Sequence, residues 1–168
     1  MYLDYWRLRD KPFEVTPDTR FYCASPGHEE ALTRLLFVCQ ERSGSMVLTG
    51  DYGCGKTLLG RVLLRELARD ARTQLALILN PHLSALEFLQ TILFELSGPK
   101  EGPREGTSKV TLLNSIHQIL IHNTQSDRDT ILIVDEAQSI TDDEVMEEIR
   151  MLTNLISIFN LWPLASNC

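Results

Sequence analysis

One eight-residue stretch constrains the fold more than any other part of the chain: Gly50-Asp51-Tyr52-Gly53-Cys54-Gly55-Lys56-Thr57. It matches the pattern G-x-x-x-x-G-K-[ST], in which a glycine-rich loop wraps a chain of phosphates. Glycine lets the backbone turn tightly and approach a ligand closely, because no Cβ is in the way. The loop N–H groups and the N-terminal end of the following helix both attract phosphate. The pattern therefore predicts a phosphate site formed by Gly50, Gly53, Cys54, Gly55, Lys56, Thr57 and Leu58.

The residues on either side provide the context that this loop requires. An apolar run at 46–49 indicates a short buried strand before it, and the apolar residues after it recur at helical spacing up to Leu67. In this arrangement Lys56 reaches the β- and γ-phosphates of a nucleotide, and the Thr57 hydroxyl holds Mg²⁺. We therefore expect ATP and Mg²⁺ as ligands. The alternative is a glycine-rich turn with no ligand.

Size and composition indicate one domain. The chain has 168 residues, of which 43% are hydrophobic, and this is enough for one sizeable core. A net charge of −7 disfavours a protein that coats nucleic acid. The four cysteines are scattered and the four histidines lack ligand spacing, so we expect reduced thiols, no zinc site and ordinary surface or helix histidines. With no signal peptide and no membrane-spanning run evident, a cytoplasmic location is expected.

A second motif combines a buried strand with two carboxylates. The four apolar residues at 131–134 lead directly into Asp135 and Glu136. In open α/β sheets, ligands bind at the carboxyl ends of the strands. After a phosphate loop, such a pair suits nucleotide hydrolysis: Asp135 contributes to the metal shell, and Glu136 polarises the attacking water. The alternative is two solvated acids at the end of a strand.

Capping and periodicity patterns predict the other elements. A continuous apolar run at 75–79 suits a strand buried on both faces of a parallel sheet. Helices are expected at 27–42, at 84–97 behind a capping box, and over a stretch that ends near Asn123. A last helix opens with a capping box at Thr141, and the acids up to Glu148 are expected to form its solvated face.

Several short motifs follow one another at a familiar spacing. They are Pro12-Phe13 with Thr16-Pro17-Asp18, His28 to Leu32, the phosphate loop, Asn80-Pro81, Val134 to Gln138, and Glu148 to Leu155. On these motifs, residues 1–155 resemble the AAA-type ATPase module of general secretion pathway protein A, which is related to transposition ATPases. The resemblance implies an α/β P-loop NTPase fold with a parallel sheet flanked by helices. It also implies ATP hydrolysis coupled to assembly of the type II secretion outer-membrane complex, with self-association or a secretion-assembly protein as partner.

The resemblance adds one catalytic residue and one binding segment. Asn80 matches the polar position that can hold the catalytic glutamate of AAA-type ATPases inactive, which implies a catalytic set of Glu136, Lys56 and Asn80. A plain turn residue before proline is the alternative for Asn80. The segment 12–28 matches the part that lies near the adenine, whereas Arg150 is expected to be a surface helix residue.

Beyond residue 155 the chain departs from the family pattern. The family continues with a strand between the P-loop strand and the Walker B strand, then sensor residues, an arginine finger and a lid. We therefore expect a chain truncated after the Walker B helix, with an extended N-terminal segment at 1–27, an ATPase core at 28–155 and a divergent tail at 156–168. Residues 156–161 are the candidate for the vacant central strand. Two other functions stay open: a nucleotide-dependent binding switch with little turnover, and a regulator of DNA transposition, for which there is no strong nucleic-acid signal.

Overall fold

Four parallel strands form the centre of the molecule, in the spatial order β1-β4-β3-β2. They are β1 (Ser45–Gly50), β2 (Thr73–Ile78), β3 (Asp129–Val134) and β4 (Ser157–Pro163). The computed structural model describes residues 2–11, 18–42, 44–98, 102–103, 106–153 and 157–163, and within 157–163 it describes the backbone only. Outside the described residues lie 1, 43, 99–101, 104–105, 154–156, 164–168 and residues 12–17 of the segment predicted to lie near the adenine.

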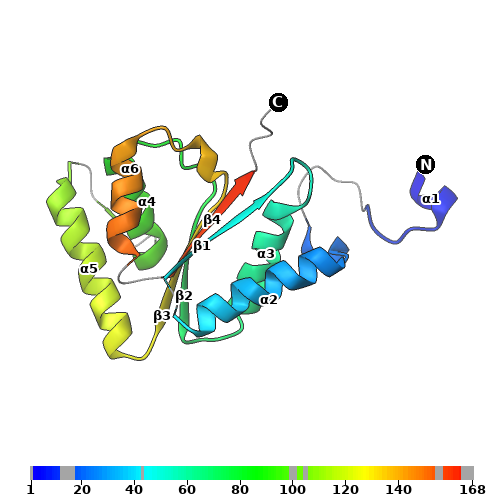
Figure 1. Ribbon diagram of the computed structural model, residues 1–168, viewed down its shortest axis with the longest axis horizontal. Helices are drawn as coiled ribbons and strands as arrows, with labels where there is room; N and C mark the ends of the chain where they lie inside the picture. The colour runs from blue at the N-terminus through cyan, green and yellow to red at the C-terminus, as the bar shows by residue number, and fades with distance from the viewer. Residues whose placement is uncertain are drawn as a thin grey trace.

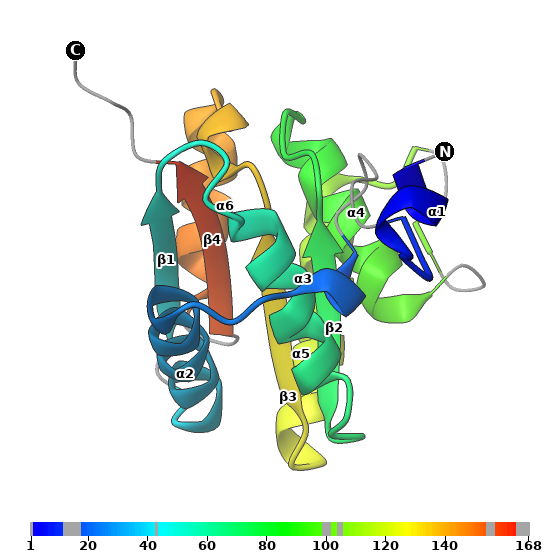
Figure 2. The same ribbon diagram turned by 90° about the vertical axis from the view of Figure 1, so that its right-hand side faces the viewer.

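Helices cover both faces of this sheet (Figure 1). On one face α2 (Pro26–Gln40) and α3 (Lys56–Leu67) pack against apolar side chains of β3, with Leu35, Leu63 and Ile133 among the buried residues. On the other face α4 (Ala85–Ser97), α5 (Lys109–Gln125) and α6 (Asp143–Leu152) bury a larger cluster. Figure 2 shows α3 lying across the sheet on the same side as α2. The predicted α/β fold, a parallel sheet flanked by helices, is confirmed.

Short elements complete the described chain: α1 (Tyr2–Trp6), the 3₁₀ turn η1 (Thr19–Phe21) and the 3₁₀ turn η2 (Ala137–Ser139). In the parts of the chain that the structure covers, we find no helix with the length and apolar character needed to cross a bilayer.

Local capping signals place the helix starts. Ser25 caps α2 and accepts a hydrogen bond from the His28 N–H, with proline at the first helical position. The capping box before α4 is formed as predicted, because Ser84 and Glu87 bond each other's backbone N–H groups. The prediction at α6 was wrong by one residue. Asp142, not Thr141, is its N-cap and accepts from the N–H of Glu144.

Three further expectations need correction. The strand predicted at 75–79 begins and ends earlier, and Leu79 is 54% exposed because it follows the last residue of β2, an edge strand. The helix predicted to end near Asn123 ends two residues later, at Gln125, so Asn123 is not its last residue. Asn123 lies inside α5, buried, and donates to Thr130 Oγ1 at 2.8 Å. Glu148 is only 6% exposed and does not belong to a solvated face, because Lys109 Nζ of α5 lies 2.8 Å from its carboxylate.

The last described strand occupies the centre of the sheet. β4 pairs with β1, where Ser45 lies opposite Ile158, and with β3, where Ile131 lies opposite Ser157. This is the position for which the sequence analysis offered residues 156–161. The domain boundaries proposed at 27 and 155 stay predictions. The arrangement matters for function because it sets the spacing between the carboxyl ends of β1 and β3.

Candidate nucleotide site

The loop between β1 and α3 has the backbone geometry that its glycines allow. Gly53 and Gly55 adopt the left-handed region, with φ of 76° and 86°, which residues with a Cβ rarely enter. Gly55 is the N-cap of α3, so the loop passes directly into the N-terminal end of that helix. The first N–H groups of a helix have no partner within it and are available to an anion.

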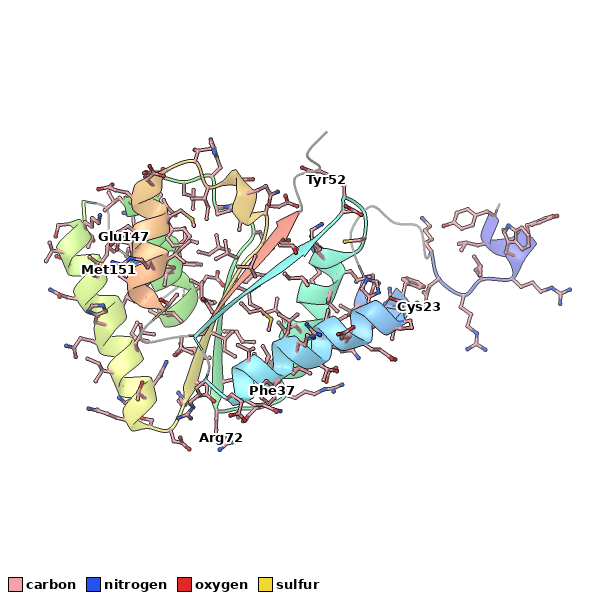
Figure 3. The ribbon with its side chains drawn as sticks, viewed as in Figure 1. Cys23, Phe37, Tyr52, Arg72, Glu147 and Met151 are labelled. Carbon is pink, nitrogen blue, oxygen red and sulfur yellow. The ribbon has the colours of Figure 1, made fainter. Side chains whose placement is uncertain are left out.

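The loop opens onto a cavity of about 250 Å³ at the carboxyl edge of the sheet. Figure 3 marks Tyr52 at the tip of the loop that follows β1. The cavity is lined by Tyr52, Gly53, Gly55, Lys56, Thr57, Leu58 and Glu136. It therefore brings the glycine-rich loop and the second carboxylate of the Asp-Glu pair together, although the two motifs are far apart in the sequence.

The ammonium group of Lys56 lies on the loop's own carbonyl groups. Its Nζ donates to the Gly50 oxygen at 2.9 Å and to the Asp51 oxygen at 2.8 Å, and it lies 3.7 Å from Cys54 Sγ. Lys56 also lines the cavity. A phosphate bound there would present anionic oxygens to Lys56 Nζ in place of the neutral carbonyl groups, and hydrogen bonds between charged groups are the stronger ones.

Thr57 and Asp135 meet across 78 residues of sequence. The Thr57 hydroxyl donates to Asp135 Oδ1 over 3.4 Å. Asp135 is 6% exposed, and burial raises the pKa of its carboxyl above the usual value, while hydrogen bonds from the Glu136 N–H (3.0 Å) and from Thr57 oppose that rise. A hydroxyl and a buried carboxylate are oxygen ligands of the kind that Mg²⁺ prefers. This pair fits the predicted metal site.

Glu136 has an unusual backbone and a side-chain restraint. Its φ of 54° is in the left-handed region, which costs a residue with a Cβ of order 1–3 kcal/mol. Its exposed carboxylate accepts a hydrogen bond from Gln138 Nε2. Gln138 Oε1 is buried without a partner among the described residues. Gln138 was not among the predicted site residues, because nothing in its spacing shows that its side chain turns back toward Glu136.

Asn80 lies two residues beyond the end of β2 and is exposed. Its Oδ1 accepts a hydrogen bond from the His82 N–H at 3.3 Å, as a turn residue does. His82 in turn approaches the Ser139 carbonyl oxygen at 3.3 Å, which links this turn to the segment after Glu136. The role that the resemblance gave Asn80 stays a prediction.

A second residue that the sequence analysis left without a role lies behind the loop. The half-buried His28 of α2 places its Nε2 2.8 Å from the Cys54 carbonyl oxygen. The pattern of loop residues could not reveal this contact, because it joins positions 26 apart.

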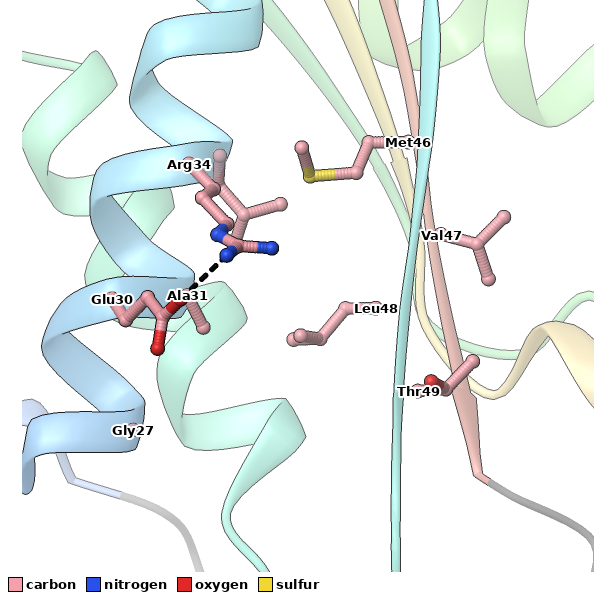
Figure 4. Close-up of a pocket in the computed structure, with 9 residues that line it drawn as sticks. Gly27, Glu30, Ala31, Arg34, Met46, Val47, Leu48 and Thr49 are labelled. Carbon is pink, nitrogen blue, oxygen red and sulfur yellow. Dashed lines mark hydrogen bonds and ion pairs between the residues drawn. The ribbon is translucent and has the colours of Figure 1, made fainter.

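Another cavity, of about 340 Å³, lies between α2 and the edge strand β1 (Figure 4). Glu30 and Arg34 form an ion pair at 2.5 Å on its helical side, and Met46 and Leu48 face it from β1. It is lined by none of the residues predicted to bind phosphate or Mg²⁺, and of the segment predicted to lie near the adenine only Gly27 lines it, so we assign it no part in the phosphate site.

Comparisons with known proteins agree with this geometry. Residues 39–162 match the family described as the AAA domain. General secretion pathway protein A of Aeromonas hydrophila is 34% identical over 155 residues, which make up 92% of this chain but 27% of that protein. The chain thus spans about a quarter of that relative.

Solved structures share the fold at lower identity. Cdc6p from Pyrobaculum aerophilum has a TM-score of 0.63 and 21% identity, over 90% of this chain and 41% of its own. Drosophila ORC bound to DNA has a TM-score of 0.64 and 16% identity, over 90% of this chain and 41% of its own. Since the family match covers both motifs and most of the sheet, this chain belongs to the AAA domain family of P-loop proteins, and within it is similar to general secretion pathway protein A.

Proposed function

We propose that this AAA domain binds ATP together with Mg²⁺ and hydrolyses the bond between the β- and γ-phosphates. The observation that supports this most is the convergence of four side chains at one edge of the sheet. Lys56 and Glu136 line the same cavity, and Thr57 next to Lys56 contacts Asp135 next to Glu136. Two motifs of different sequence position thus supply a cation, a hydroxyl and two carboxylates to one place.

Binding rests on the loop and on Lys56. The loop glycines and the N-terminal end of α3 present N–H groups to the phosphates, and Lys56 exchanges the Gly50 and Asp51 carbonyls for phosphate oxygens. Gly50, Cys54 and Leu58 complete the set of predicted contacts.

Catalysis rests on the two carboxylates and Thr57. Thr57 and Asp135 are the residues that would hold Mg²⁺, which when bound helps to neutralise charge on the β- and γ-phosphates. Glu136 accepts a proton from the water that attacks the phosphorus. Its hydrogen bond to Gln138 fixes the carboxylate until nucleotide and water are in place. Asn80 is proposed to bias the same carboxylate from the β2 turn.

The cellular role follows from similarity. We infer that hydrolysis is coupled to assembly of the type II secretion outer-membrane complex, through self-association or a secretion-assembly protein. What supports this is the 34% identity to general secretion pathway protein A, of which this chain spans 27%.

A titration with and without Mg²⁺ tests the binding site. We expect wild-type protein to bind ATP more tightly with Mg²⁺, and Asp135→Asn to lose that Mg²⁺-dependent increase. Asp143→Asn is the matched control, because it removes the same charge from an exposed position at the start of α6. If Asp135→Asn keeps the full Mg²⁺ effect, the metal assignment is wrong. Phosphate release in the same samples separates an ATPase from a nucleotide-dependent switch, which binds ATP and scarcely turns it over.

A further inference from the structure

The imidazole of His28 joins the N-terminus of α2 to the back of the phosphate loop. Nδ1 lies 3.0 Å from Ser25 Oγ, and Nε2 lies 2.8 Å from the Cys54 carbonyl oxygen. A carbonyl can only accept, so Nε2 carries the proton of this hydrogen bond. In the neutral ring Nδ1 then accepts from the Ser25 hydroxyl, whose oxygen also accepts from the His28 N–H at 3.3 Å. The network therefore selects one tautomer and one ring orientation.

Holding the Cys54 carbonyl also orients the next N–H. The peptide between Cys54 and Gly55 is trans, and in a planar trans peptide the C=O and N–H bonds point in opposite directions. His28 holds the oxygen on the side of α2, so the Gly55 N–H points to the other side. Gly55 lines the cavity that Glu136 also lines, whereas His28 and Cys54 line a different cavity on the α2 side of the loop, and Lys56 lines both. The His28 contact thus turns the Gly55 N–H toward the phosphates.

The loop needs such a restraint because its glycines leave the peptide free to rotate. Gly53 and Gly55 reach both left- and right-handed backbone regions at little cost. A reversed Cys54–Gly55 peptide would present a carbonyl oxygen to an anion and repel it. His28 also approaches closely, since a Cβ on Gly55 would lie 3.3 Å from its Nε2.

We propose that His28 is a positioning residue of the phosphate loop: its hydrogen bond to the Cys54 carbonyl keeps the Gly55 N–H directed at a nucleotide phosphate. The inference rests on the proposed ATP-binding function, because it concerns the same site. It predicts that the donor at Nε2 matters, and not merely the bulk of the ring.

Three variants separate donor position from bulk. His28→Gln carries an amide N–H at about the reach of Nε2, His28→Asn carries one only at the reach of Nδ1, and His28→Ala carries none. Loss of one hydrogen bond should weaken ATP and ADP binding about three- to tenfold in His28→Ala and His28→Asn. Binding by His28→Gln should stay close to wild type. Thermal unfolding of each variant checks that the protein is folded.

A measurement without nucleotide reads the same peptide directly. Cys54-Gly55 is the one Cys-Gly pair in the sequence. Protein labelled with ¹³C-carbonyl cysteine and ¹⁵N glycine therefore gives a single carbonyl–amide cross-peak, from this peptide. We expect its carbonyl resonance to move upfield in His28→Ala and His28→Asn and to be retained in His28→Gln.

The outcomes distinguish this inference from the proposed function. If His28→Ala keeps both the wild-type carbonyl resonance and the wild-type affinity, or if His28→Asn behaves as His28→Gln does, His28 does not position the loop. If wild-type protein binds no ATP, the proposed function fails, while the cross-peak still decides whether the hydrogen bond exists.

Discussion

Replacing Lys56 by alanine should weaken ATP binding by about ten- to a hundredfold. In the structure its Nζ donates to the Gly50 and Asp51 carbonyls at 2.9 and 2.8 Å. A hydrogen bond to a charged group contributes about 1.5–3 kcal/mol. On binding, Lys56 exchanges its contacts with carbonyl groups for stronger ones to phosphate, so Lys56→Ala loses the net equivalent of about one charged hydrogen bond. A loss of about 1.4 kcal/mol in binding free energy corresponds to a tenfold weaker affinity.

Titration of a fluorescent ATP analogue measures this effect, and AMP serves as an internal comparison. AMP lacks the β- and γ-phosphates that Lys56 contacts, so its affinity should change little in Lys56→Ala. Arg69→Ala is the matched control, since it removes a positive charge from an exposed site just beyond the far end of α3. If Lys56→Ala and Arg69→Ala bind ATP equally well, the loop is not the phosphate site.

Three further predictions concern charge, access and packing. Burial raises the pKa of Asp135, so its ionisation opposes folding as pH rises. Asp135→Asn should therefore raise the melting temperature of the ligand-free protein at pH 7.5, and the rise should be smaller below pH 4. A variant that melts at a lower temperature than wild type at pH 7.5 would contradict the burial argument. Mass-spectrometric mapping should find exposed Cys54 alkylated in the absence of nucleotide and protected by Mg-ATP. Buried Cys39, whose pKa burial raises to about 12, should stay unmodified in both samples. If Mg-ATP does not protect Cys54, phosphates do not lie over the loop. Leu112→Ala, which truncates a buried side chain of α5, should lower the free energy of unfolding by about 2–5 kcal/mol in denaturant titration. Ile121→Ala, at an exposed position of the same helix, should lower it far less, and equal losses would contradict the packing described.

The parts of the fold that the sequence predicted are those with local causes. The phosphate loop depends on glycines at fixed offsets, and the start of α4 depends on Ser84 and Glu87, three residues apart. The Asp135–Glu136 pair was placed at a strand end because an apolar run leads into it. Each of these signals lies within a few residues, so no knowledge of distant contacts is needed.

Apart from the N-cap of α6, the errors arise where the rest of the fold overrides what neighbouring residues indicate. Glu148 lies among other acids, which is typical of a solvated face, but Lys109 from α5 pairs with it and buries it. Leu79 belongs to an apolar run, yet β2 ends before it at the edge of the sheet.

The same reasoning explains the site residues that were missed. His28 reaches the loop, 26 residues away, only because α2 packs beside α3. Gln138 lies only two residues from Glu136, but the contact forms because the turn η2 brings its side chain back to that carboxylate. Both residues belong to motifs that support the family resemblance, but neither motif shows which residue the side chain contacts. The central position of β4 came from the sheet order of the resembling family, and no residue pattern within 157–163 specified it.

Phosphate release by Glu136→Gln tests the central claim most directly. At saturating Mg-ATP, wild-type protein should release phosphate, and Glu136→Gln should bind ATP comparably but release phosphate at least about a hundredfold more slowly, as expected for loss of a general base. Glu147→Gln, which changes an exposed acid of α6, should turn over at the wild-type rate. If Glu136→Gln hydrolyses ATP as fast as wild type does, Glu136 is not the base, and if wild-type protein binds ATP without releasing phosphate, the domain is a switch and not an ATPase.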